Sequence, residues 1–287
     1  MNSSFKNSNI ADILIQTLPY IQEYSGCNIV VKYGGNAMTS DILESEVMED
    51  ITLLQSIGIR VVLVHGGGPE ITCMMSKLGK KAKFINGLRV TDKETIEIAE
   101  MVLAGKVNKK LVNLLQKYNG KAVGISGVDG KLCEVQQKSK QLGYVGDIIA
   151  VHPNILLDLL NAGYIPVIAS IGCDSNGLTY NINGDAAAAE IAVAIHSKKL
   201  IMMTDISGVL LDVNDPTTLV HELTVQEAEK LKEKGSINEG MLPKIDSCNR
   251  AIQGGVPRVS ILDGRVAHSI LIELLTDEGS GTMIYGG

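Results

Sequence analysis

Short apolar runs alternate with amphipathic helical patterns along most of this chain, and this alternation limits the fold more than any other feature. The runs are apolar on both faces, which is typical of parallel strands covered by helices on each side. We therefore expect an α/β fold around a central, mainly parallel sheet. The strand-like runs are residues 27–33, 60–65, 121–126, 164–170, 199–204 and 258–262, and the helical patterns include 41–58, 93–119 and 225–235.

Two segments lie outside this alternation. Residues Ile10 to Tyr24 have a helical apolar period and predict an N-terminal helix, which Pro19 should kink. Residues Lys131 to Asp147 are more polar and interrupted by glycine, as an excursion of short antiparallel strands would be. No repeat, low-complexity tract or proline-rich linker divides the chain, so we expect one continuous unit with two lobes.

The composition disfavours several classes of protein. With 287 residues, of which 45 % are hydrophobic and 20 % charged, the chain can bury a sizeable core. A formal charge of −6, with 3 % aromatic residues and no tryptophan, argues against a nucleic-acid partner. Five widely spaced cysteines without a CxxC pair indicate neither a zinc site nor a disulfide framework, so we expect no metal site and a reducing compartment.

The sequence also bears on where the protein works. No apolar run reaches the roughly 18 to 20 residues of a membrane span, so we expect no membrane partner. The first ten residues have neither the apolar core of a signal peptide nor the arginines of a transit peptide. A cytoplasmic protein is expected, or one of the plastid stroma if the gene is organellar.

Two glycine-rich loops follow the first two strand-like runs. Lys32, Gly34 and Gly35 end the first, and Gly66 to Gly68 follow the second. Ligands gather at the carboxyl ends of parallel strands, and glycine loops that open onto helices suit anions. Tight turns alone would explain one such loop, but two loops and a lysine favour anion binding. No GxxxxGK[ST] occurs and no GxGxxG follows a strand, so neither a P-loop nor an ordinary Rossmann enzyme is expected.

Six motifs together are far more specific than any one of them. They are KYGGNAM, VHGGGPEI, GLRVTD, NINGDAAAAEIA, TDISGVL and GSINEGMLPKI. With them the chain resembles the amino acid kinase family from about Asn28 to Ile284. The resemblance implies a three-layer sandwich with an open sheet between helices. It also implies an N-terminal helix for oligomerisation and regulation, an acyl-acceptor lobe and a nucleotide lobe in one catalytic domain, at residues 1–26, 27–180 and 181–287.

The resemblance implies ATP-dependent phosphorylation of the side-chain carboxylate of N-acetyl-L-glutamate, a step of arginine biosynthesis. Such a carboxylate is already ionised near neutral pH, so the reaction needs positioning and cations more than a base. Lys32 and Lys244 are the candidate cations, and the resemblance assigns them to the transferring phosphoryl group and the nucleotide phosphates. Asp185 would hold both ammonium groups in place.

The acceptor is expected to bind through the Gly67 and Gly68 N–H groups, Arg89 and Asn181. A surface ion pair for the arginine and a turn or capping role for the asparagine are the alternatives. His65 is expected to be a packed core histidine without a role. Mg²⁺ would be held mostly by phosphate oxygens and water. The residues expected to bind ATP are Gly34, Gly35, Thr204, Asp205, Ser207, Gly208, Val209, Leu210, Ser236, Ile237 and Asn238.

Arginine-inhibited members of the family resemble this chain in their N-terminal helix and in a C-terminal stretch like residues 263–284. The resemblance implies a homohexamer, a trimer of dimers joined by that helix, and it adds a PII-type signalling protein to the partners. His268, Glu278 and Gly281 would form the arginine site, because an acidic side chain and turn carbonyls can anchor a guanidinium. The alternative is an edge helix with a solvated acidic turn.

Two other readings of the sequence stay open. One is a different kinase of the same family, acting on glutamate, aspartate, carbamate or a nucleotide. The other is a non-catalytic amino-acid sensor on the same fold. The presence of Lys32, Lys244 and Asp185 argues against a sensor, which has no need of two cations beside a phosphate path.

Overall fold

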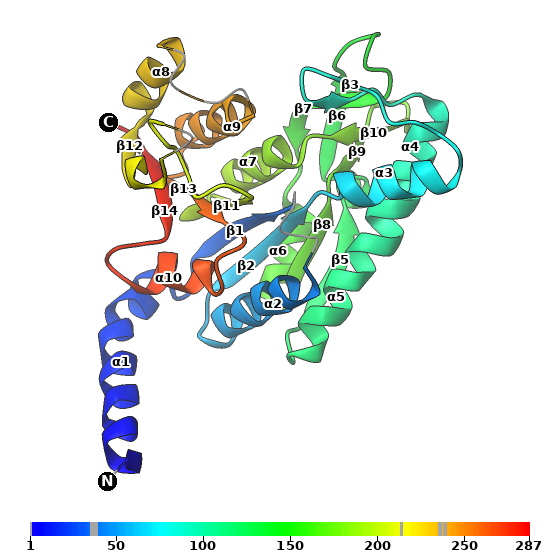
Figure 1. Ribbon diagram of the computed structural model, residues 1–287. Coiled ribbons are helices and arrows are strands. Elements are labelled where there is room, and N and C mark those ends of the chain that lie inside the picture. The colour runs from blue at the N-terminus through cyan, green and yellow to red at the C-terminus, as the bar shows by residue number, and fades with distance from the viewer. Residues whose placement is uncertain (1, 35–39, 213–214, 235–236, 238–239) are drawn as a thin grey trace.

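A sheet of eight strands runs through the described part of this computed structural model, in the order β12-β14-β13-β11-β1-β2-β8-β5 (Figure 1). The structure describes residues 2–34, 40–212, 215–234, 237 and 240–287, with residues 2–9 and 216 as backbone only. All neighbouring strands are parallel except β13 and β14. The strands are β1 (Asn28–Tyr33), β2 (Arg60–His65), β5 (Ala122–Ser126), β8 (Ile165–Ala169), β11 (Lys199–Thr204), β12 (Glu222–Thr224), β13 (Arg258–Asp263) and β14 (Gly281–Tyr285).

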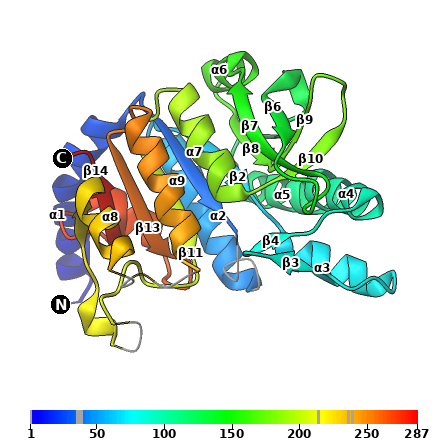
Figure 2. The ribbon, with the colours of Figure 1, turned by 90° about the horizontal axis from the view of Figure 1, so that it is seen from above.

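Helices cover both faces of this sheet, so the predicted α/β sandwich is confirmed (Figure 2). Ile29 and Val31 of β1 belong to one buried apolar cluster and Val30 to the other, because successive side chains of a strand point to opposite faces. One face carries α2 (Asp41–Ser56), α5 (Asn108–Lys117) and α10 (Ser269–Leu275). The other carries α6 (Asn154–Asn161), α7 (Gly184–Ala194), α8 (Val225–Glu233) and α9 (Leu242–Gln253).

Smaller elements lie beyond the carboxyl ends of β2, β5 and β8. Strands β6 (Cys133–Gln137) and β7 (Val145–Val151) are antiparallel, which confirms the predicted excursion, and they close a small barrel with β9 (Ile171–Cys173) and β10 (Thr179–Ile182). The short hairpin β3 (Phe84–Ile85) and β4 (Leu88–Arg89) follows α3 (Gly68–Lys77). Short 3₁₀ turns occupy Asp129–Lys131 and Pro216–Thr218.

The helical pattern predicted over residues 93–119 contains an unexpected segment. It is divided into α4 (Lys93–Glu100), a π-helix η2 (Met101–Val107) and α5. A π-helix widens the turn and is rare outside functional sites. The segment packs against α3, directly behind the second glycine loop.

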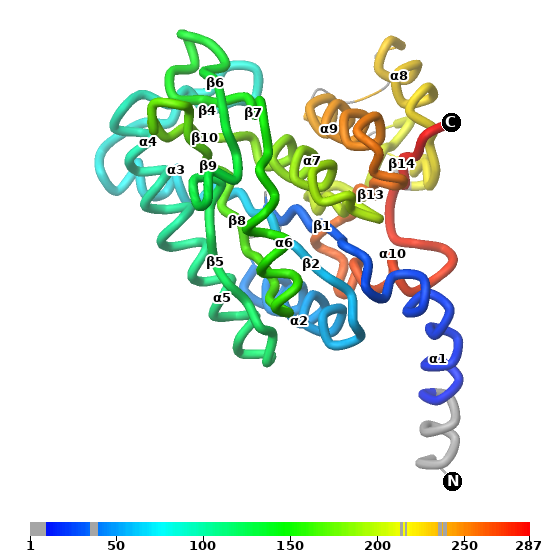
Figure 3. Tube along the Cα trace, turned by 180° about the vertical axis from the view of Figure 1, so that it is seen from behind, coloured from blue at the N-terminus to red at the C-terminus, as the bar shows by residue number. Residues whose placement is uncertain are grey.

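The N-terminal helix α1 (Asn2–Tyr24) extends away from the rest of the chain and contacts α10 at its base (Figures 1 and 3). It begins earlier than predicted and continues through Pro19. Apolar side chains are exposed along it, including Leu14 at 63 % and Ile15 at 69 %. A search of the described residues finds no helix with the length and apolarity to cross a membrane.

Candidate active site

Two lysines meet one aspartate at the carboxyl ends of the central strands. Lys32 lies on β1, opposite Val64 of β2 and Met202 of β11. Asp185 and Lys244 lie in the first turns of α7 and α9. Asp185 Oδ1 is 2.8 Å from Lys32 Nζ, and Oδ2 is 2.9 Å from Lys244 Nζ. The structure thus brings together the three residues predicted as catalytic, while their chemical roles stay a prediction.

These three charges are held in a buried setting. Lys32 and Asp185 are each 6 % exposed. Burial acts to raise the pKa of Asp185, but the two ammonium groups outweigh it and lower the pKa to about 2. Burial lowers the pKa of Lys32, against the opposing charge of Asp185 and in concert with that of Lys244. Two cations around one carboxylate leave an excess positive charge that suits a polyanion such as a polyphosphate.

Side chains are absent where the backbone passes Lys32. A Cβ at Gly34 would lie 3.3 Å from Lys32 Nζ, and a Cβ at Gly184 would lie 3.5 Å from Lys32 Cε. The Gly66 N–H donates to the Tyr33 carbonyl at 3.1 Å, which holds the two glycine loops side by side. These glycines keep the surroundings of the ammonium group open. Gly35, predicted with Gly34, lies outside the described residues.

The second glycine loop leads directly into α3. This helix begins at Gly68, and Gly67 is its N-cap without a side-chain capping bond. The first N–H groups of a helix have no acceptor within it, so those of Gly67 and Gly68 are available to an anion. A Cβ at Gly67 would lie 2.6 Å from Leu103 Cδ2 of η2, so a larger residue would displace the loop.

Arg89 lies beneath this loop and is 6 % exposed. Its guanidinium donates to the Gly68 carbonyl and to Thr72 Oγ1, both at 2.7 Å, and it stacks on the Phe84 ring at 4.8 Å. In the chain as described, no carboxylate pairs with it, and burial alone lowers its pKa. A buried guanidinium without an anionic partner is unfavourable, so a ligand carboxylate would complete this site. The predicted alternative of a surface ion pair is wrong.

Asn181 does not cap the α7 helix, which was the alternative to its binding role. It lies on β10, where its backbone N–H donates to the Tyr144 carbonyl at 2.9 Å. The N-cap of α7 is Asn183, whose Oδ1 accepts from the N–H groups of Asp185 and Ala186. Asn183 was not among the predicted site residues, although an asparagine just before an alanine-rich run is a capping signal. By fixing the start of α7, Asn183 positions Asp185.

The predicted nucleotide residues between 204 and 210 begin at Thr204, the last residue of β11. The negative charge of Asp205 acts to raise the pKa of Lys32, against the larger effect of burial. The Val209 N–H donates to Thr282 Oγ1 at 2.9 Å, and Gly208 has a φ of 143°. Thr204 and Ile237 are buried, and Leu210 forms a bridge with Leu219. Ser236 and Asn238 lie outside the described residues.

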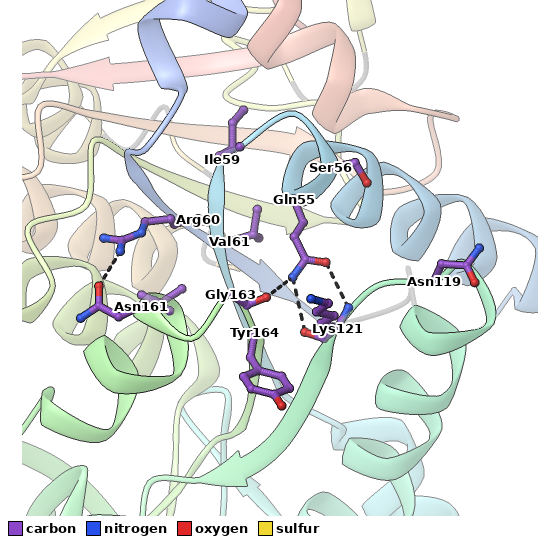
Figure 4. Close-up of a pocket in the computed structure, with 12 residues that line it drawn as sticks. Gln55, Ser56, Ile59, Arg60, Val61, Asn119, Lys121, Asn161, Gly163 and Tyr164 are labelled. Carbon is purple, nitrogen blue, oxygen red and sulfur yellow. Dashed lines mark hydrogen bonds between the residues drawn. The ribbon is translucent and has the colours of Figure 1, made fainter.

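Two cavities lie at opposite ends of the central strands. One of about 950 Å³ is bordered by β7 and the first turns of α7 and α9, and Asp185 and Lys244 line it. Another of about 500 Å³ lies at the amino ends of β2, β5 and β8 (Figure 4). There the Gln55 amide donates to the Gly163 carbonyl at 2.8 Å and accepts from the Lys121 N–H at 3.1 Å. Arg60 donates to the Asn161 side chain.

A third pocket, of about 280 Å³, lies between the base of α1 and the C-terminal stretch. Glu278 and Gly281 line it together with Tyr20 of α1, whose hydroxyl bonds the Asp277 carboxylate. His268, the third predicted regulatory residue, is not part of its lining. His268 precedes α10 with a φ of 56°, and its Nδ1 lies 2.6 Å from the buried Asp50 carboxylate of α2, which raises the pKa of the imidazole.

Residues 28–263 match the model of the amino acid kinase family, and the chain belongs to this family. The predicted membership is therefore confirmed. Two relatives are nearly half identical in sequence to this chain. Acetylglutamate kinase of Caldanaerobacter subterraneus subsp. tengcongensis is 49 % identical over 276 residues, covering 96 % of this chain and 92 % of the relative. Acetylglutamate kinase of Brachyspira hyodysenteriae is 48 % identical over 284 residues, covering 98 % and 99 %.

A solved structure shows the same arrangement of elements. N-acetylglutamate synthase from Neisseria gonorrhoeae, in complex with coenzyme A and N-acetyl-glutamate, matches with a TM-score of 0.85 at 28 % identity. The match covers 96 % of this chain but 63 % of the synthase chain, so this chain spans less than two thirds of that protein. The likeness supports the predicted family fold over nearly the whole chain.

Proposed function

We propose that this protein is an ATP-dependent kinase that phosphorylates the side-chain carboxylate of N-acetyl-L-glutamate, a step towards arginine. The observation that carries the proposal is the buried bridge from Lys32 through Asp185 to Lys244, which leaves excess positive charge where glycine loops keep the backbone open. The names of relatives that are nearly half identical over almost the whole chain support this substrate.

The proposed reaction is a direct transfer between two oxygens. A carboxylate oxygen of the acceptor attacks the γ-phosphorus of ATP, the bond to the β,γ-bridging oxygen breaks, and ADP leaves with that electron pair. No proton moves, because the acceptor is already ionised. Lys32 would stabilise the charge on the transferring group, Lys244 that on the nucleotide phosphates, and Asp185 would keep both ammonium groups in line.

The acceptor and the nucleotide would approach from the two proposed lobes, residues 27–180 and 181–287. Arg89 would bind the α-carboxylate of the acceptor, the Gly67 and Gly68 N–H groups its anionic oxygens, and Asn181 a polar group beside them. ATP would lie over residues 204–210 and around Ile237. Mg²⁺ would be held by phosphate oxygens and water, since the described residues contain no group of three or more His, Cys, Asp or Glu side chains placed to hold a metal.

An ADP-release assay with four acceptors tests this function. N-acetyl-L-glutamate should support turnover, whereas L-glutamate, L-aspartate and carbamate should support little. Equal turnover with free glutamate would contradict the proposed preference for the acetylated acceptor, and turnover with carbamate alone would favour another kinase of the family. Binding of an amino acid without any ADP release would indicate a sensor instead.

We further propose that arginine inhibits the enzyme from the pocket between α1 and the C-terminal stretch. Glu278 and Asp277 give this pocket an acidic wall that suits a guanidinium, and Tyr20 ties α1 to it. The exposed apolar side chains of α1, such as Ile13 and Leu14, would be covered by the same helix of another copy in a hexamer. A PII-type partner and a cytoplasmic location stay predictions.

Deleting residues 1–25 tests this regulatory proposal. The truncated protein should sediment and scatter light as a dimer, retain catalysis and lose most of its inhibition by millimolar arginine. If arginine does not inhibit the full-length protein, the proposal of arginine as the inhibitor is wrong. If the truncated protein stays hexameric, the proposed role of α1 in assembly is wrong. Titration with a purified PII-type protein tests that partner separately.

A further inference from the structure

His65 is the last residue of β2, and its imidazole is fully buried behind the second glycine loop. Its Nδ1 lies 2.8 Å from the carbonyl oxygen of Gly66, and its Nε2 lies 3.1 Å from Asn108 Nδ2. A carbonyl oxygen can only accept, so Nδ1 carries the proton and donates to Gly66. The imidazole therefore joins the glycine loop to α5.

Asn108 fixes this tautomer. The same Nδ2 also lies 2.8 Å from the Val167 carbonyl oxygen and 3.1 Å from the Ile125 carbonyl oxygen, so the amide nitrogen faces this side and its two hydrogens are shared among three acceptors. It can only donate to His65 Nε2, which must be unprotonated. Burial lowers the pKa of His65 to about 4, in agreement with a neutral ring.

Asn108 occupies this place because of two neighbouring features. It follows the π-helix η2 directly, and its side chain fills the space left by Gly124 on β5, where a Cβ would lie 1.9 Å from Asn108 Oδ1. From the same π-helix, Leu103 packs against Gly67. One segment therefore supports the glycine loop twice, by apolar contact at Gly67 and through Asn108 and His65 at Gly66.

We infer that His65 is a positioning residue, which holds the Gly66 carbonyl so that the Gly67 and Gly68 N–H groups stay aimed at the acceptor. The inference rests on the proposed function of that loop. Phosphoryl transfer depends on alignment, and a misplacement of about 1 Å can lower the rate by about 10²-fold. The η2 segment and Asn108 supply the rigid support.

A pair of substitutions separates the two hydrogen bonds of the ring. In His65→Asn the side-chain nitrogen can take the place of Nδ1 and still donate to Gly66. In His65→Gln the longer side chain reaches towards Asn108 and leaves the Gly66 carbonyl without its donor. Each variant loses one buried hydrogen bond, so both should lose a similar free energy of unfolding, measured as a similar fall in the urea midpoint.

The two variants should differ in function although they are similar in stability. His65→Gln should lower kcat/KM for the acceptor by roughly 10-fold or more, with the KM for ATP little changed. His65→Asn should keep most of the wild-type kcat/KM for the acceptor. Equal losses in both variants would show that the ring serves stability alone and would overturn the inference.

Amide hydrogen exchange of the resting protein gives a readout that does not depend on turnover. The Gly66 amide, whose N–H donates to the Tyr33 carbonyl, should exchange faster in His65→Gln than in His65→Asn, and ring ¹⁵N shifts of the wild type should show the neutral Nδ1–H form. The same exchange in both variants, or an Nε2–H ring, would overturn the positioning role. If the two variants show the expected exchange difference but the wild type transfers no phosphoryl group to N-acetylglutamate, the proposed function is refuted instead.

Discussion

The carboxyl ends and the amino ends of the parallel strands form two sides of the sheet, called here its carboxyl edge and its amino edge. Each carries an arginine beside a backbone loop, yet the two arginines are in opposite situations. Arg60, at the amino edge, is partly exposed and bonds the Asn161 side chain (Figure 4). Arg89, at the carboxyl edge, is buried, and no carboxylate of the described chain pairs with it. Water stabilises the charge of Arg60, whereas Arg89 depends on a partner that the described part of the chain does not supply.

The same contrast holds for the backbone. At the amino edge, Gln55 bonds the main chain of Lys121 and Gly163 in both directions. At the carboxyl edge, the first N–H groups of α3 open onto a loop without side chains. Both edges contain a cavity of a size that a ligand could occupy. Unmet bonding capacity, more than volume, distinguishes the carboxyl edge, where we propose that the chemistry takes place.

The largest effect is expected from Asp185→Asn. The amide keeps the shape of the side chain but removes the charge between the two lysines, so burial and mutual repulsion would lower the pKa of Lys32 further. We expect kcat to fall by about 10² to 10³-fold, with the fold retained. ADP release and a thermal melt measure the two quantities, and a variant with wild-type turnover would remove Asp185 from the mechanism.

Lys32→Arg and Lys244→Arg should have the next largest effect. Each keeps its charge, but a planar guanidinium cannot take the place of a compact ammonium at a short phosphate contact, so kcat should fall by roughly 10²-fold. Steady-state kinetics at saturating ATP and acceptor give the value. Unchanged turnover in one of the two variants would show that the corresponding lysine acts only as a bulk charge.

Arg89→Ala should mainly weaken binding of the acceptor. Its KM for N-acetylglutamate should rise by about 10-fold or more and far exceed any change in the KM for ATP. Arg60→Ala is the matched control, because it removes an arginine from the other edge of the same sheet. Equal changes in both KM values for Arg89→Ala, or a similar rise in the control, would contradict the assigned role.

The smallest effect is expected from Gln55→Ala at the amino edge. Loss of its bonds to Lys121 and Gly163 should lower the free energy of unfolding by about 1 kcal/mol, since the side chain is partly exposed. Urea denaturation measures this change, and kcat should stay within experimental error of the wild type. A marked fall in kcat without loss of stability would mean that this edge also serves the reaction.

Much of the fold could be predicted from periodicity, because each strand-like run is apolar on both faces and lies in the central sheet. The short β12 and the antiparallel β14 were not predicted. Neither was the π-helix, since residues 101–107 keep a helical apolar pattern whatever the width of the turn. Two asparagines, Asn181 and Asn183, stand close together before α7, and only the structure shows that the second is its N-cap.

Only part of the candidate site could be predicted from the sequence, and the reason is physical. Lys32, Asp185 and Lys244 stand in distinctive motifs, and the structure brings them together. The bonds of His65 and Asn108 depend on the packing of α5 and η2 against β5 and β8, which no local pattern encodes. His268 bonds Asp50 of α2 and does not line the pocket at α1, because it contacts a segment far away in the sequence.

The position of β1 between β2 and β11 has a consequence for how the chain acquires its activity. β1 can pair with β2 soon after both are made, but its other neighbour comes far later in the sequence. Contacts between distant segments form slowly because a long loop must first be closed. During refolding, residues 27–180, the proposed acceptor lobe, should therefore gain protected amides before Lys32 meets Asp185 and before any turnover returns.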